Sequence, residues 1–190
     1  MHRLISLHDD IFSQVEKASW LLPLLARLIF AGVLLMYFWN SGVTKLGDGP
    51  FGFLSPSVGA YAQIFPRAME AVVFDVSQMS FWQYLVVLGG TWAEFILPAL
   101  IVVGLATRLS ALGMIGFIVV QSLTDLYGHG AITDAATLGA WFDRAPDGVI
   151  LDQRAFWVFL LLVLVFRGAG LLSLDRAVDS LMPYREKLRG

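Results

Sequence analysis

Residues 81–126 read FWQYLVVLGGTWAEFILPALIVVGLATRLSALGMIGFIVVQSLTDL, and this stretch decides the fold. It contains two apolar runs, 81–103 and 109–126, separated by a short segment that begins Gly104-Leu105-Ala106-Thr107. A helix that crosses a hydrocarbon core of about 30 Å needs roughly 20 mostly apolar residues. The stretch therefore predicts two membrane-spanning helices joined by a tight antiparallel hairpin.

Two further apolar stretches, 20–39 and 155–174, meet the same length criterion. The chain has 190 residues, of which 57% are hydrophobic and 15% charged. Soluble domains average about 45–50% apolar and about 25% charged residues, so too few polar groups are present here to cover a soluble surface. We predict an all-α fold, a single integral membrane four-helix bundle over residues 1–190.

The segments outside the four spans have their own patterns. Within residues 1–19, Leu4, Leu7, Ile11 and Val15 share one helical face, which predicts an interfacial helix on the membrane surface. The two long connections, about 40–80 and 128–153, are expected outside the membrane on one side. The remaining residues, 175–190, are expected to form a cytoplasmic tail.

Lysine and arginine positions predict the orientation, because cytoplasmic loops carry an excess of these residues. The side with the larger number has Arg3, Lys17, Arg27, Arg108, Arg167, Arg176, Arg185, Lys187 and Arg189. The other side has Lys45, Arg67, Arg144 and Arg154. Both termini are therefore expected in the cytoplasm, with the two long loops outside.

Composition excludes several classes of chemistry. The chain has no cysteine, which rules out thiolate catalysis, disulfide exchange, iron–sulfur clusters held by cysteine and cysteine-based zinc sites. Three histidines are too few for two haems each held by a histidine pair. A net charge of −2 gives no indication of nucleic-acid binding. The chain is therefore not expected to be a redox enzyme by itself, and no catalytic residue is assigned.

Three charged residues lie deep inside the predicted spans, where each charge costs about 2.5–3.5 kcal/mol on insertion scales. At 1.5 Å per residue, Arg27, Glu94 and Arg167 lie roughly 10–15 Å from the predicted cytoplasmic surface. We therefore expect a buried Arg27–Glu94–Arg167 cluster. Two interpretations stay open: an ion-pair staple that fixes the register of three helices, or a site for an anion, a lipid headgroup or a proton.

A second polar set is predicted near the outer face. Gln121, Asp125 and His129 are spaced i, i+4, i+8, while Asn40 and Lys45 close the outer end of the first helix. Asp125 and Lys45 are a candidate ion pair. The set is either ordinary solvated helix ends or an outward-facing pocket for a small ligand. Asp125 and His129 alone supply too few ligands for a metal site, so none is assigned.

Several segments of the chain resemble the DoxX family of small four-helix bacterial membrane proteins. They are Ala26-Arg27-Leu28, Asn40-Ser41-Gly42-Val43-Thr44-Lys45, Ala93-Glu94-Phe95-Ile96-Leu97-Pro98, the hairpin at 104–112, and Arg167-Gly168-Ala169-Gly170-Leu171-Leu172-Ser173-Leu174-Asp175. Together they extend over about residues 20–45 and 81–180. The two long loops lie outside the resemblance.

The resemblance implies a multi-pass protein of the bacterial inner membrane that is associated with oxidoreductase systems. One branch of the family is similar to the small subunit of a thiosulfate:quinone oxidoreductase, and another accompanies oxidative-stress complexes. Members with a segment like Ser41–Lys45 accompany enzymes that make copper-binding modified peptides. The implied function is a non-catalytic membrane subunit of an oxidoreductase or copper/redox-homeostasis system that binds a quinone or a lipid.

Two other functions stay open from the residues. One is a small-solute transporter or permeation path that uses the Arg27–Glu94–Arg167 cluster. The other is an enzyme within the bilayer that uses Glu94 as acid or base. The expected partners are membrane lipid, an oxidoreductase subunit or a peripheral protein. A homodimer is a further candidate, because Gly89 and Ala93 form a small-xxx-small pair.

Overall fold

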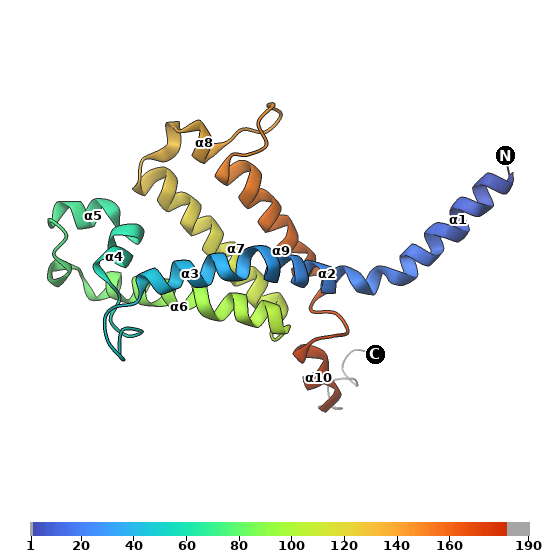
Figure 1. Ribbon diagram of the computed structural model, residues 1–190, viewed down its shortest axis with the longest axis horizontal. Coiled ribbons are helices and arrows are strands. Elements are labelled where there is room, and N and C mark those ends of the chain that lie inside the picture. The colour runs from blue at the N-terminus through green and yellow to red at the C-terminus, as the bar shows by residue number, and fades with distance from the viewer. Residues whose placement is uncertain (1, 182–190) are drawn as a thin grey trace.

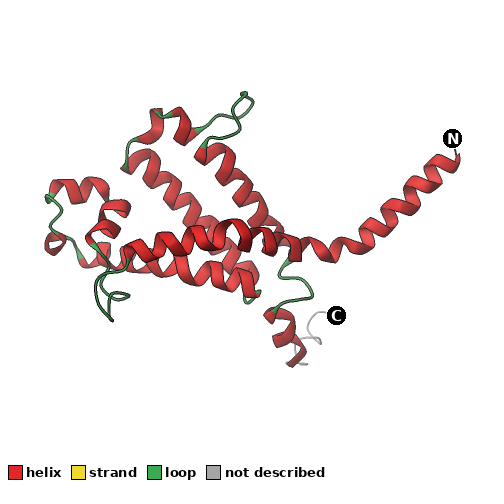
Figure 2. Cartoon of the chain, viewed as in Figure 1, coloured by secondary structure: helices red, strands yellow, loops and turns green. Residues whose placement is uncertain are grey.

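The computed structural model describes residues 2–181, and within that range helices are the only regular secondary structure (Figures 1 and 2). Four of its helices are long and apolar enough to cross a membrane. The all-α prediction is therefore confirmed, and the fold is consistent with a multi-pass membrane protein. The first of these four helices runs without a break from His8 to Lys45; its apolar part consists of α2 and α3 with a wider π-helical turn, η2 (Ala31–Leu35), between them.

The helices follow one another with short connections except in two places. In chain order the α-helices are α1 (His2–Lys17), α2 (Leu21–Phe30), α3 (Met36–Lys45), α4 (Val58–Ile64), α5 (Pro66–Ala71), α6 (Phe81–Val103), α7 (Thr107–Leu123), α8 (Ala135–Leu138), α9 (Ala155–Arg167) and α10 (Leu174–Leu181). Two more π-helical turns extend the spans, η4 (Thr124–Gly128) after α7 and η6 (Val149–Arg154) before α9.

The first span packs between two others. Its α2 half lies against α9 and its α3 half lies against α6, while α7 contacts both α6 and α9. Figure 1 shows that the α3–α6 pair and the α7–α9 pair diverge away from the α6–α7 turn. We call the end with this turn the hairpin end, and the opposite end, with residues 46–80 and 129–148, the loop end.

Apolar side chains from all four spans form the core. The completely or almost completely buried members are Ala26, Phe30, Leu34, Phe38, Ile101, Ala111, Met114, Ile118, Leu161 and Leu164. Near the loop end, Phe38 makes edge contacts with Phe117 and Trp157, and Tyr37 contacts Trp157. These aromatic contacts join the diverging helix pairs.

Three of the predicted spans have different bounds in the structure, and the third differs least, at Thr107–Gly128 instead of 109–126. The first span continues past Trp39 to Lys45, because the polar residues at 40–45 remain helical. The fourth begins at Val149 and ends at Arg167, several residues earlier than the predicted 155–174. Gly168 and Gly170 have φ angles of 76° and 80°, which end the helix in a conformation that glycine adopts readily.

Side chains cap the starts of both hairpin helices, α6 and α7. At the loop end, Ser80 and Gln83 form a capping box at the start of α6. At the start of α7, however, the side chain of Asp175 accepts hydrogen bonds from the backbone N–H groups of Ala106 and Thr107, at 2.6 and 3.0 Å. The loop after α9 is thereby tied to the α6–α7 hairpin.

The first long loop folds back onto α6 and forms a second small core. Ala60, Tyr61, Met69 and Val87 are buried together there. In addition, Trp92 donates a hydrogen bond to the carbonyl of Phe53 (2.7 Å). This loop therefore covers α6 near the loop end, rather than extending freely into solvent.

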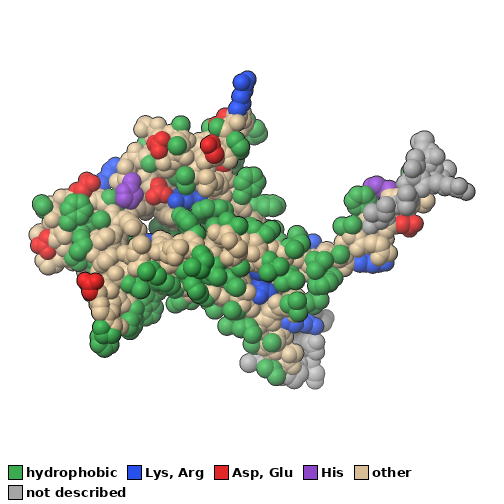
Figure 3. Space-filling view, in the orientation of Figure 1, with side chains coloured by type: hydrophobic (Ala, Val, Ile, Leu, Met, Phe, Trp, Pro, Cys, Tyr) green, Lys and Arg blue, Asp and Glu red, His purple; other side chains and the backbone are tan. Residues whose placement is uncertain are grey.

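Side-chain type is distributed as a membrane environment requires. Hydrophobic side chains cover much of the sides of the bundle, whereas acidic side chains gather mainly over the loop end and on α1 (Figure 3). The helical segment predicted at the N-terminus is present as α1, which projects away from the bundle (Figure 1). Residues 182–190 of the predicted tail lie outside the described residues.

The predicted orientation can be tested with single cysteines, because the chain has none of its own. Asp143 and Ser180 are exposed and lie on opposite sides of the fourth span. In intact cells we expect a membrane-impermeant maleimide to label Asp143→Cys, and to label Ser180→Cys only after permeabilisation. The reverse pattern would overturn the assignment of the termini to the cytoplasm.

Candidate functional site

A buried ion pair joins α3 to α6 and is the centre of the candidate site. The Lys45 ammonium lies 3.0 Å from each carboxylate oxygen of Glu94. Both residues are nearly inaccessible, with exposed fractions of 4% and 2%. A charge removed from water is costly unless it is paired and hydrogen-bonded, so the two residues depend on each other.

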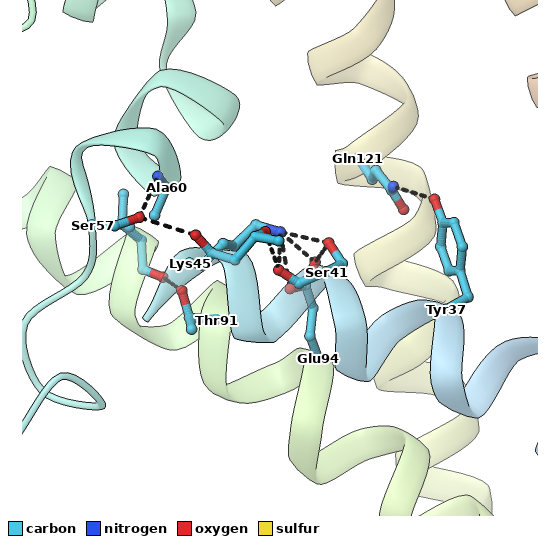
Figure 4. A network of polar contacts seen from close by, with 10 residues as sticks. Tyr37, Ser41, Lys45, Ser57, Ala60, Thr91, Glu94 and Gln121 are labelled. Carbon is cyan, nitrogen blue, oxygen red and sulfur yellow. Dashed lines mark hydrogen bonds and ion pairs between the residues drawn. The ribbon is translucent and has the colours of Figure 1, made fainter. Parts of the chain in front are cut away.

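Ser41 completes the hydrogen bonding of this pair. It precedes Lys45 by one helical turn and therefore lies on the same face of α3. The Lys45 ammonium donates to the Ser41 hydroxyl (2.6 Å) and to the Ser41 carbonyl (3.2 Å), and the hydroxyl donates to Glu94 Oε1 (3.0 Å). Figure 4 shows the three side chains pointing toward one another between α3 and α6. The Lys45–Glu94–Ser41 triad uses all three protons of the ammonium.

A glycine allows α3 and α6 to approach closely enough for this pairing. A Cβ atom added at Gly42 would lie 2.7 Å from ring atoms of Phe95, the neighbour of Glu94. No real side chain fits in that space without moving the ring. Gly42 is therefore required by its position between Ser41 and Lys45 on one helix and Glu94 and Phe95 on the other.

The triad lies at the polar end of a groove between α6 and α7, with a volume of about 510 Å³. The groove wall along the two helices is apolar and is formed by residues such as Val86, Ala93, Leu97, Phe117 and Val120. Val86 and Val120 are half exposed on the outside of the bundle. The groove therefore opens sideways, at the level of the apolar spans.

Four glycines give the groove its width. Gly89 and Gly90 lie on α6, and Gly113 and Gly116 lie on α7. A Cβ atom added at Gly89 or Gly116 would meet nothing within 4 Å. The space beside these two glycines is therefore open, and a larger side chain there would enter it.

Most of the predicted outer polar set lines the same groove. Lys45, Gln121, Asp125 and His129 are lining residues, whereas Asn40 is exposed and is not among them. The structure thus brings four of the five predicted residues to one cavity. Figure 4 shows Gln121 on α7, opposite the triad, where its amide nitrogen donates to the Tyr37 hydroxyl (3.2 Å).

The predicted Lys45–Asp125 pair is wrong, because each residue has another partner. Asp125 pairs with Arg154, whose guanidinium lies 2.7 Å from the carboxylate and is 4% exposed. The same guanidinium donates to the Ser122 hydroxyl at 2.9 Å. Asp125 and Arg154 both lie in π-helical turns, a distortion that is frequent at functional sites. His129 has a different partner in the same groove: its Nε2 lies 3.0 Å from the Gln63 carbonyl oxygen.

The predicted Arg27–Glu94–Arg167 cluster is also wrong. The Arg27 guanidinium donates to the carbonyls of Ile101 (3.1 Å) and Val102 (2.6 Å) at the end of α6. It also donates to the carbonyls of Ala169 (3.1 Å) and Leu172 in the loop after α9. The last carbonyls of a helix have no partner within it, and Arg27 supplies partners at the hairpin end while Glu94 pairs with Lys45.

Arg167 belongs to a separate cavity at the hairpin end. This cavity has a volume of about 540 Å³, and its lining includes Arg108, Arg167, Arg176 and Asp175. It shares no lining residue with the groove between α6 and α7. Arg27 and Arg167 therefore lie at the hairpin end, whereas Glu94 lies at the groove between α6 and α7.

Comparison with known proteins assigns neither a family nor a function to this chain. No family model matches the chain, and neither a curated protein nor a solved structure matches it. The resemblance to the DoxX family stays a prediction that rests on the matched segments. Within residues 2–181, no three histidine, aspartate or glutamate side chains come together in a way that could hold a metal ion.

Proposed function

We propose that this chain is a non-catalytic membrane subunit that binds an amphipathic, lipid-soluble molecule in the groove between α6 and α7. The observation that carries the proposal is the shape and chemistry of the groove. A long apolar wall ends at the buried Lys45–Glu94–Ser41 triad, and the opening faces sideways at the level of the spans. Ligand sites are mostly apolar cavities with a few polar groups that fix orientation.

A molecule with a small polar head and an apolar tail matches this arrangement. The head would lie at the triad, and the tail would follow the glycine-lined wall toward the acyl chains of the bilayer. Quinones and single-chain lipids belong to this class. The resemblance to oxidoreductase-associated membrane proteins favours a quinone-type ligand and a redox partner that carries out the electron transfer.

The packing between the two cavities favours binding over permeation. Phe30, Leu34, Ile101 and Met114 are almost completely buried, and they lie on the helices between the hairpin-end cavity and the groove. A solute that entered the groove would meet this core rather than a polar route. The transporter interpretation therefore has less support from the geometry.

Filling the groove with a side chain should remove the ligand. Gly116→Phe would place a ring in the open space of the groove, and Gly32→Phe is the matched control. Gly32 is also a span glycine with open space around it, but it lies outside the groove. We expect native mass spectrometry after gentle extraction to show a bound molecule lighter than a phospholipid on the wild type and on Gly32→Phe.

The Gly116→Phe protein should lack this bound molecule while unfolding at the same temperature as the control. Equal amounts of the molecule on both variants would contradict binding in the groove. A wild-type protein that carries only phospholipid would contradict the proposed class of ligand.

A further inference from the structure

Two buried side chains of the groove, Glu94 and Gln121, have acceptor capacity that the described residues leave unused. All three protons of the Lys45 ammonium are used within the triad. Glu94 Oε1 accepts from both Lys45 and Ser41, whereas Oε2 accepts from Lys45 alone among the described residues. A carboxylate oxygen accepts more than one hydrogen bond, so Glu94 Oε2 has capacity for another donor.

The opposite wall provides a second free acceptor. Gln121 lines the groove on α7, and its amide nitrogen already donates to Tyr37. Its carbonyl oxygen, Oε1, is buried without a hydrogen-bond partner in the described part of the chain. A buried polar atom of this kind costs free energy until it is satisfied, so the site is incomplete without a donor.

The charged residues at the groove form complete ion pairs, which favours a ligand without net charge. Lys45 pairs with Glu94, and Asp125 pairs with Arg154. A cationic donor would add an uncompensated charge beside two complete ion pairs, at the level of the apolar spans. A neutral donor, such as a hydroxyl group, satisfies Glu94 Oε2 and Gln121 Oε1 without that cost.

We infer that the groove binds the hydroxyl-bearing form of a lipid-soluble ring compound, a phenol of the hydroquinone type, in preference to a quinone. This inference rests on the proposed function and specifies its ligand. The open space beside Gly89 on α6 and Gly116 on α7 leaves room for a flat ring. A ring hydroxyl donates to the free acceptors, whereas a quinone carbonyl can only accept.

Three probes with the same alkyl chain test the inference: a short-chain hydroquinone, its dimethyl ether and the corresponding quinone. Binding is measured by equilibrium dialysis against the protein in detergent micelles under argon, with empty micelles subtracted. We expect the hydroquinone to bind about tenfold more tightly than the other two, as a hydrogen bond to a charged acceptor provides. The ether is the control for ring size and tail.

Gln121→Leu connects the preference to the acceptors. Glu94→Gln is less suitable, because it leaves Lys45 buried without a counter-charge and the protein then fails to fold or loses stability. Gln121→Leu removes the second acceptor without changing either ion pair, and Gln153→Leu, an exposed glutamine outside the groove, is its matched control. We expect Gln121→Leu to reduce the preference for the hydroquinone several-fold, and Gln153→Leu to leave it unchanged.

The outcomes separate this inference from the proposed function. Equal or tighter binding of the quinone or the ether, lost in Gly116→Phe, would overturn the donor preference and keep the groove as a binding site. A hydroquinone preference that is unchanged in Gln121→Leu would overturn the assignment of the acceptors. Failure of all three probes to bind would overturn both proposals.

Discussion

Replacing Glu94 with alanine should destabilise the protein by about 3–5 kcal/mol, because the Lys45 ammonium then remains buried without a counter-charge. The hydrogen bond from Ser41 to the carboxylate is lost as well. The free energy of unfolding can be measured by titration with sodium dodecyl sulfate in mixed micelles. The expected loss is a large part of the 5–15 kcal/mol that is typical of folded proteins.

The double variant Lys45→Met with Glu94→Leu is the control for this prediction. It removes both charges and replaces them with apolar side chains of similar length. A buried ion pair contributes little net stability compared with well-packed apolar residues, so the double variant should recover most of the lost stability. If Glu94→Ala is as stable as the wild type, or if the double variant is as unstable as Glu94→Ala, the interdependence of Lys45 and Glu94 is contradicted.

The second large effect is expected at the hairpin end. Arg27→Ala removes the guanidinium that connects the last turn of α6 with the loop after α9. The Ile101 carbonyl still accepts from the Gly104 N–H, and each of the other buried carbonyls left without a donor costs about 1–3 kcal/mol. We expect a total loss of at least about 3 kcal/mol on this basis, measured by the same titration.

Two other variants distinguish the geometry of Arg27 from its charge. Arg27→Lys keeps the charge but replaces a planar group with several donors by a compact ammonium, so it should recover only part of the stability. Arg108→Ala removes an exposed guanidinium at the same end and should change stability by no more than about 0.5 kcal/mol. Equal effects of Arg27→Ala and Arg108→Ala would contradict the role of the buried hydrogen bonds.

The packing around Arg27 at the hairpin end also requires a glycine, Gly104. Gly104 has a φ angle of 72°, and a Cβ atom added there would lie 2.7 Å from the Cβ of Ser173 and 2.8 Å from the guanidinium carbon of Arg27. The left-handed conformation and the close approach both require glycine at this position. The end of α6, Arg27 and the loop after α9 therefore form one packed unit.

The spans could be predicted from the sequence because length and apolarity depend only on local residues. The bounds of α6, 81–103, are as predicted, and its capping box depends on a spacing of three residues. The ends of the first and fourth spans were less predictable. In the first span, the polar residues at 40–45 stay helical because they pack against α6. That packing is a property of the folded bundle and not of the segment.

The partners of the buried charges could not be predicted for a related reason. Depth along a straight helix places Arg27 and Glu94 in one layer, but the long Lys45 side chain reaches back along α3 to Glu94. The acceptors of Arg27 are backbone carbonyls, which every residue has and no residue type indicates. Arg154 was placed on the outer side only as a topology signal, although its pairing with Asp125 is a central contact of the loop end.

The outer polar set was more predictable, because Gln121, Asp125 and His129 recur at intervals of four residues on one helix. The structure places them with Lys45 around one groove. The glycines of the groove wall were a weaker indication of a cavity, because glycines in membrane spans also occur where two helices pack closely together. Only the open space beside Gly89 and Gly116 shows that they border a cavity.

The most direct test of ligand binding in the groove is photo-crosslinking from its wall in native membranes. The photoreactive residue p-benzoylphenylalanine is placed at Gly89, which faces the open space of the groove, and at Gly32 as the control outside it. We predict that irradiation attaches a ring-containing, lipid-soluble molecule at Gly89 and only phospholipid at Gly32. The same phospholipid adducts at both positions would contradict the account.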